Sequence, residues 1–383
     1  MEFQNLLGMN ILEKFNHRQS ILKNASKLIV LFVVIGGMLQ SCSDDSEGFE
    51  PQESAESEES VQEESNSAIQ FEQVGFWGEV SDSSDSDGYG GNGYGGDGYG
   101  GDGYGGDDDT VDDGESSEEG ITFKSPNGVA IDLNDNVYTT EFRNNRIQKF
   151  SSNGELLLQW GSTGTENGQF LNPTGIAIDS KGNVYVSESG NHRVQKFTAN
   201  GEWILTIGVQ GQGQGEFNSA MVIAIDSDDN MYVTDWGNNR VQVFDATGNY
   251  IRTISGQGSQ NGRLNNPTGI KIDDEGNLWV VDRGNDRIQK FTVQGEFIMA
   301  FGASGSNQGQ FLVPTSINFD SEGNLYVSEV DNSRVQIFNS QGQYLDEVGP
   351  GLFQAPHGLA FDSKGFLYVM DTGNNVIRKF QTK

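Results

Sequence analysis

Six acidic residues recur at equivalent points of the chain, and a ring of carboxylates could bind a metal ion or transfer protons. Each ends a short apolar run: Glu141, Glu188, Asp235, Asp282, Glu329 and Asp371. In five units an arginine follows five residues later: Arg146, Arg193, Arg240, Arg287 and Arg334. This constant spacing favours internal ion pairs. Asp371 is the exception, because Val376 takes the position of the arginine.

Other residues suited to catalysis are few. Of three histidines, His17 lies in the N-terminal segment, His192 lies in a turn, and His357 replaces the Thr, Asn or Met of other units. The sequence has no G-x-S-x-G motif. Without His17 of the N-terminal segment, one or two histidines remain, and they cannot form a three-histidine zinc site. Turns such as Asp226–Asn230 are interpreted as side-chain-capped turns rather than calcium loops. We therefore predict no catalytic residue, metal ligand or cofactor.

These residues lie within a repeat. Its units begin at Phe123, Phe170, Phe217, Leu264, Phe311 and Phe353, 47 residues apart except for a last step of 42. Each unit holds four short β-branched and aromatic runs separated by turn residues, as in GIAID, NVYVSE, RVQKF and EWILTIG of the second. Units of this length with four antiparallel strands predict an all-β fold, a six-bladed β-propeller.

The motifs P-x-G-[IV]-A-[IV]-D, G-N-[VL]-Y-V and N-x-R-[IV]-Q-K-F resemble the NHL repeat across nearly all of 121–383. The resemblance implies a six-bladed propeller. Some NHL proteins are ubiquitin ligases, but those need a Cys/His-rich RING, and this chain has a single cysteine. Some related propellers are lactonases or lyases with a metal in the central channel. For such an enzyme His357 and Asp371 are the first candidates.

The last unit stops after its third strand, so another segment must close the ring. Phe71–Glu79 aligns with Gly154–Ser162, and we predict a closing strand within residues 69–78. Residues 79–120 then form a long disordered loop rich in Gly, Tyr and Asp. We expect its tyrosines, Tyr89, Tyr94, Tyr99 and Tyr104, to lie beside the binding face.

The N-terminal part differs in composition. Residues 43–120 hold 25 acidic residues and no Lys or Arg, which predicts disorder, and the net charge of −32 argues against nucleic-acid binding. The apolar run 28–39 resembles a signal-peptide core, and LQSC resembles the lipobox of bacterial lipoproteins. We predict a signal peptide over 1–41, lipidation at Cys42 and an acidic disordered tether over 42–68. The protein is then lipid-anchored in the bacterial cell envelope, at the outer membrane or cell surface.

The loops before the first strand and after the second strand of each unit open on one face. Large or charged residues there depart from the small polar residues typical of the repeat. The predicted ligand-binding residues are Phe142, Arg143, Met221, Trp236, Arg283 and His357. We interpret the protein as a monomeric binding protein for a protein, peptide or glycan rather than as an enzyme. The alternative is a lactonase- or lyase-type propeller with a metal in its channel.

Overall fold

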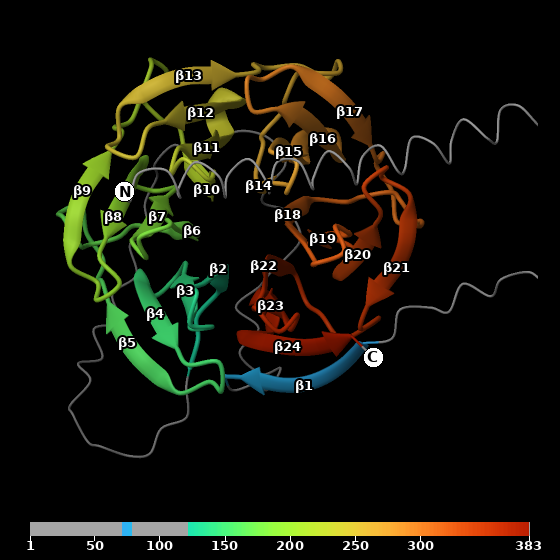
Figure 1. Ribbon diagram of the computed structural model, residues 1–383, viewed down its shortest axis with the longest axis horizontal. Coiled ribbons are helices and arrows are strands. Elements are labelled where there is room, and N and C mark those ends of the chain that lie inside the picture. The colour runs from blue at the N-terminus through green and yellow to red at the C-terminus, as the bar shows by residue number, and fades with distance from the viewer. Residues whose placement is uncertain (1–70, 79–121, 383) are drawn as a thin grey trace, which may run out of the picture. The chain divides into compact units, whose positions relative to one another are not determined.

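Six four-stranded antiparallel sheets surround a central axis (Figure 1). The structure is a computed structural model that describes residues 71–78 and 122–382. The predictions for the signal peptide, Cys42, the tether and the tyrosine-bearing loop lie outside these residues. Within the described residues no helix is long and apolar enough to cross a membrane. The prediction of an all-β, six-bladed propeller is confirmed.

Each sheet is one blade, and its strands follow one another outward from the axis. The innermost strands are β2 (Pro126–Ile131), β6 (Pro173–Ile178), β10 (Ala220–Ile225), β14 (Ile270–Ile272), β18 (Pro314–Phe319) and β22 (Pro356–Phe361). The second strands are β3 (Val137–Glu141), β7 (Val184–Glu188), β11 (Met231–Asp235), β15 (Asn277–Asp282), β19 (Leu325–Glu329) and β23 (Leu367–Asp371). The third strands are β4 (Arg146–Phe150), β8 (Arg193–Phe197), β12 (Arg240–Phe244), β16 (Arg287–Thr292), β20 (Arg334–Phe338) and β24 (Val376–Thr382).

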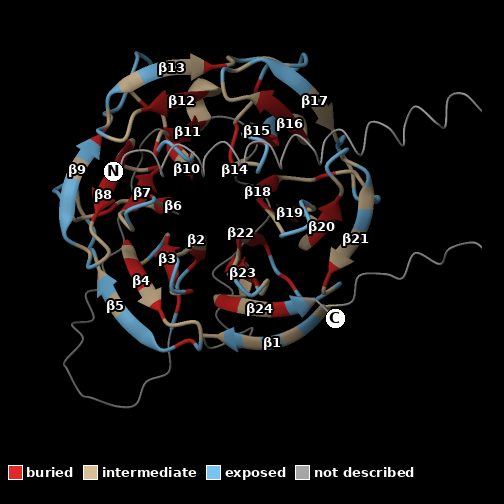
Figure 2. Cartoon of the chain, viewed as in Figure 1, coloured by how far each residue is buried: buried red, intermediate tan, exposed pale blue. Residues whose placement is uncertain are grey.

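The outer strands are β5 (Leu156–Trp160), β9 (Trp203–Ile207), β13 (Tyr250–Ile254), β17 (Phe297–Phe301), β21 (Tyr344–Val348) and β1 (Phe71–Trp77). Three short 3-10 helices follow second strands: η1 (Trp236–Asn238), η2 (Arg283–Asn285) and η3 (Thr372–Asn374). Buried residues concentrate on the inner strands and exposed residues on the outer ones (Figure 2). The second strands are buried on both faces because each blade packs between two others, so that even their polar and acidic residues are buried.

Strand β1 completes the sixth blade. It pairs antiparallel with β24, from Phe71 opposite Thr382 to Trp77 opposite Ile377. The ring of Trp77 lies 5.5 Å from that of Phe150 in blade one and 5.6 Å from that of Tyr368 in blade six, centroid to centroid. The segment predicted to close the ring therefore supplies the missing outer strand, and its tryptophan joins the last blade to the first.

Neighbouring blades are also joined by a repeated hydrogen bond, which the side chain of the residue before each arginine position accepts from a backbone amide of the next blade. The Oδ1 atom of Asn145 accepts from the Asn172 amide at 2.8 Å. His192 has the same role, since its Nδ1 accepts from the Ser219 amide at 2.9 Å. Asn375 closes the ring by accepting from the Ser125 amide at 2.8 Å. His192 is therefore a structural residue.

Candidate functional site

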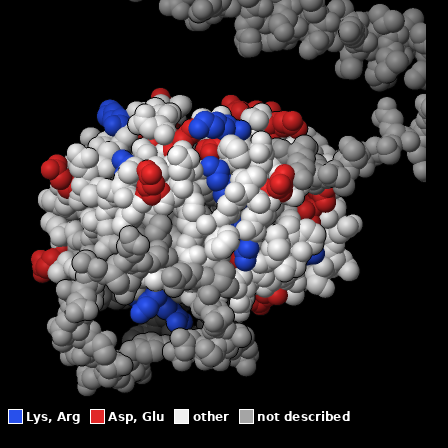
Figure 3. All heavy atoms as spheres, turned by 90° about the horizontal axis from the view of Figure 1, so that it is seen from below, with Lys and Arg blue, Asp and Glu red and all other residues white. Residues whose placement is uncertain are grey.

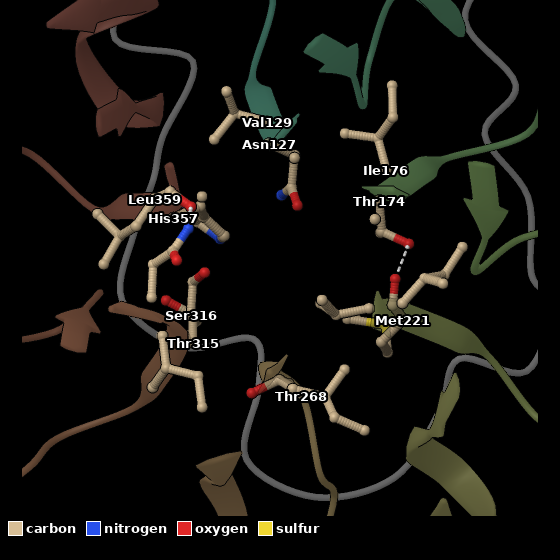
Figure 4. A pocket seen from close by; sticks show the side chains of 18 of the residues that line it. Asn127, Val129, Thr174, Ile176, Met221, Thr268, Thr315, Ser316, His357 and Leu359 are labelled. Atoms are coloured by element: carbon tan, nitrogen blue, oxygen red, sulfur yellow. Dashed lines mark hydrogen bonds between the residues drawn. The ribbon is translucent and has the colours of Figure 1, made fainter. Parts of the chain in front are cut away.

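A pocket lies where the six innermost strands meet. The cavity inside it measures about 100 Å³ and opens to solvent. One residue near the start of each inner strand, or just before β14, contributes to a ring around the axis (Figure 4): Asn127, Thr174, Met221, Thr268, Thr315 and His357. These are the variable residues of the first loop of each unit. Each blade therefore contributes one variable side chain to the ring around the axis.

Close approach of the inner strands holds this ring in place. A Cβ atom on Gly175 would lie 2.5 Å from the carbonyl oxygen of Met221 in the next blade, so blade two needs glycine at this position. Hydroxyl groups of second strands donate to backbone carbonyls of ring residues in the following blade. The Thr234 hydroxyl donates to the Thr268 carbonyl at 2.7 Å, and the Ser328 hydroxyl donates to the His357 carbonyl at 2.6 Å. The backbone beneath His357 is thus fixed before any ligand binds.

The charge of the pocket has one sign. Among the described residues that line it, Lys271, Arg283 and His357 can carry positive charge, and none is an aspartate or glutamate. Lys271 was not among the predicted binding residues. The repeat has alanine at its position in four units, and asparagine in the fifth, so comparison of the units could have found it: Ala130, Ala177, Ala224, Ala360 and Asn318.

His357 is a neutral base with a defined proton position. Its Nδ1 lies 3.0 Å from the carbonyl oxygen of Ala355, which can only accept, so Nδ1 carries the proton and Nε2 keeps its lone pair. Burial, together with the nearby charge of Arg283, lowers the pKa of His357 to about 4. The imidazole can therefore accept a proton at neutral pH.

Four of the six predicted binding residues line the pocket: Phe142, Met221, Arg283 and His357. Arg143 is exposed and Trp236 is half-buried, and neither lines it. The Trp236 carbonyl accepts from the Asn239 amide in the turn of η1. Successive turn residues point in different directions, so a shared loop does not imply a shared cavity.

The six buried carboxylates are bound to arginines rather than open to the pocket. Five pair with the predicted arginine, with Nε–O distances from 2.5 to 2.8 Å. Asp371 also has a partner, which corrects the expectation drawn from Val376: Arg378 Nε lies 2.6 Å away. Arg378 occupies the position of Gln195 in the second blade, where glutamine donates to Glu188. Blade six thus keeps the charge pair with its arginine two residues later.

A divalent metal does not fit this site. The pocket offers one imidazole beside two cationic side chains, whereas metal sites need several carboxylate or imidazole ligands. No group of three or more His, Cys, Asp or Glu suited to a metal occurs among residues 71–78 and 122–382. The Asp226 turn is a side-chain cap, because its carboxylate accepts from the Asp228 and Asn230 amides and from Tyr232.

The family of the chain follows from its match to known sequences. A model described as the virginiamycin B lyase family matches residues 113–379. The chain belongs to the virginiamycin B lyase family. No curated protein sequence matches it.

Solved structures of similar fold include members of that lyase family. A virginiamycin B lyase from Staphylococcus aureus with quinupristin has a TM-score of 0.50 and 20% identity, covering 67% of this chain and 80% of that one. A streptogramin B lyase has a TM-score of 0.53 and 15% identity, covering 69% of this chain and 95% of that one. A gluconolactonase from Xanthomonas campestris has a TM-score of 0.55 and 18% identity, covering 68% of this chain and 87% of that one. At these identities the likeness shows the fold.

Membership of a lyase family corrects the functional prediction. The interpretation as a binding protein rather than an enzyme is wrong, and the enzyme alternative is favoured. That interpretation depended on the absence of an acid–base pair in the sequence. The enzyme alternative had already named His357 as a first candidate.

Proposed function

We propose that the protein is a lyase that opens an ester or lactone in the central pocket, with His357 as the general base. One observation carries the proposal. The Nδ1–H of His357 is used by the Ala355 carbonyl, so Nε2 carries a lone pair in a pocket that otherwise holds only polar neutral, apolar and cationic groups. A base of this kind contributes about 100- to 10,000-fold to a proton-transfer reaction.

The relatives support this assignment. The Staphylococcus aureus enzyme was captured with quinupristin in a catalytically inactive variant in which a histidine is replaced by alanine. That protein therefore depends on a histidine, and His357 is the histidine that lines the pocket here. The other described histidine, His192, accepts a hydrogen bond from the Ser219 amide in a contact between blades.

The chemistry follows from the lyase class and the residues present. His357 Nε2 takes a proton from a carbon next to the carbon that bears the ester oxygen. The C–O bond breaks, a C=C bond forms, and the acid portion of the ester leaves as a carboxylate. Negative charge develops on the substrate during this step. Arg283, a cation that lines the same pocket, stabilises it. Apolar walls from Ile176, Ile270 and Leu359 limit access of water, which favours elimination over hydrolysis.

The His357→Thr variant tests the proposal. Threonine is the residue of three other blades at this position, so the fold accommodates it. We expect kcat on virginiamycin B to fall about 100- to 10,000-fold. The matched control is His192→Asn, which introduces the residue of three other blades and should leave the rate unchanged.

Mass spectrometry of the product separates elimination from hydrolysis. The elimination product has the mass of the substrate, whereas the hydrolysis product gains one water. Unchanged turnover by His357→Thr would overturn the role of His357. A product that gains one water would overturn the lyase assignment and indicate a lactonase.

We further propose that the repeat units are NHL units and that the enzyme is anchored in the cell envelope through Cys42. The repeated N-x-R-[IV]-Q-K-F motif supports the first statement, and the apolar run followed by LQSC supports the second. Replacing Cys42 with serine should release the protein from the membrane fraction. Retention of the variant in that fraction would contradict the anchor.

A further inference from the structure

Lys271 stands apart from the other lysines of the blades. Lys196 lies 3.0 Å from Asp179 and Lys290 lies 2.9 Å from Asp273, each pairing with the aspartate that caps a turn of its own blade. Lys271, on the inner strand β14, lines the pocket, and its side chain makes no hydrogen bond or ion pair with any residue that the structure describes. Burial lowers its pKa, and no neighbouring carboxylate opposes the effect.

The surroundings of Lys271 offer no counter-ion. The amide of Asn318, on the next inner strand, donates to the Leu359 carbonyl at 2.8 Å, and its oxygen accepts from the Phe319 amide. Asn318 is thus already committed to the backbone. Ile270, Ile317 and Ser316 also line the pocket. A cation placed among apolar groups is costly unless an anion joins it.

The positive pocket contrasts with the rest of the propeller. Residues 121–383 hold 19 Lys and Arg against 28 Asp and Glu. On the side of the molecule shown in Figure 3, charges of both signs are interspersed. A pocket lined by cations and no carboxylate is therefore a local feature of the channel rather than a consequence of overall composition.

We propose that Lys271 binds a carboxylate group of the substrate in the central pocket. The inference rests on the proposed function only in taking this pocket as the substrate site. A carboxylate carries a single negative charge and matches one ammonium group with a hydroxyl such as that of Ser316, which lines the same pocket. Phosphate carries more charge and needs more donors than one ammonium group and one hydroxyl provide. The substrate class is therefore an ester or lactone that bears a free carboxylate.

Binding of simple probes tests this subsite without turnover. Hexanoate and its neutral analogue hexanamide are titrated into the full-length protein by calorimetry. We expect hexanoate to bind at least about 10-fold more tightly than hexanamide, as for a charge-assisted hydrogen bond. In Lys271→Ala, which introduces the residue of four other blades, the preference should disappear. The control is Lys181→Ala, which removes a 70% exposed lysine that pairs with Asp229 and should keep the preference.

Two results would overturn the proposal. The first is that Lys271→Ala still prefers hexanoate to hexanamide. The second is that inorganic phosphate displaces hexanoate at a lower concentration than acetate does. The proposed catalytic role fails separately. His357→Thr should keep the preference for hexanoate while losing turnover. Turnover that survives in His357→Thr would therefore refute the base and leave the carboxylate site intact.

Discussion

Replacing Trp77 with alanine tests whether the N-terminal strand holds the ring closed. The Trp77 ring contacts the rings of Phe150 and Tyr368 and lies over Gly154, where a Cβ atom would come within 2.5 Å of Nε1. A fully buried tryptophan costs about 3–5 kcal/mol when truncated to alanine. Trp77 is half-buried, so we expect the free energy of unfolding to fall by about 2–3 kcal/mol. For a domain of this size the melting temperature then falls by about 5–10 °C.

The assay is thermal unfolding of the full chain followed by circular dichroism, with Phe76→Ala as the matched control. Phe76 lies on the same strand beside Trp77 but is 52% exposed. Its truncation should change the free energy of unfolding by no more than about 0.5 kcal/mol. If both variants melted together with the wild type, β1 would not be a structural part of blade six, and the ring would be closed in another way.

Two further predictions concern charged groups. Arg378→Ala leaves the buried carboxylate of Asp371 without its cation, and we expect a loss of about 3–5 kcal/mol in urea unfolding, against little change for the exposed Arg143→Ala. Equal urea midpoints for Arg378→Ala and Arg143→Ala would contradict the pairing of Arg378 with Asp371. The acid limb of the pH profile of kcat/KM should fall near pH 4, because burial and Arg283 keep His357 neutral until the pH drops through its lowered pKa. A limb near pH 6.5, measured from initial rates, would show that the base is not His357 in this environment.

The repeat and the ring closure were predictable because both depend on comparison of the chain with itself. Alternating apolar residues define the strands, and the missing fourth strand of the last unit pointed to Phe71–Glu79. The partner of Asp371 was not found, because a fixed spacing of five residues led to Val376. Antiparallel register brings Arg378 opposite Val369, beside the end of β23, and so a glutamine position could supply the arginine.

The pocket was only partly predictable. Arg143 shares a turn with Phe142 but does not line the pocket, since side-chain direction in a turn depends on its dihedral angles. Trp236 has the repeat position of Phe142 and Arg283 and does not line the pocket either. Lys271 departs from alanine in the repeat, a signal visible in the sequence. Its meaning depends on the structure, because only there does it lack the aspartate partner that Lys196 and Lys290 have.

Strand formation, the number of blades and the buried ion pairs follow from residues close together in the chain, where local pattern governs conformation. The character of the pocket depends on ring closure, which brings Asn127 of the first blade and His357 of the last to one axis (Figure 4). The proton position and lowered pKa of His357 arise from its burial, its bond to Ala355 and the charge of Arg283. No pattern in the sequence encodes these surroundings, and they distinguish His357, the proposed base, from the variable residues at the same position of the other blades.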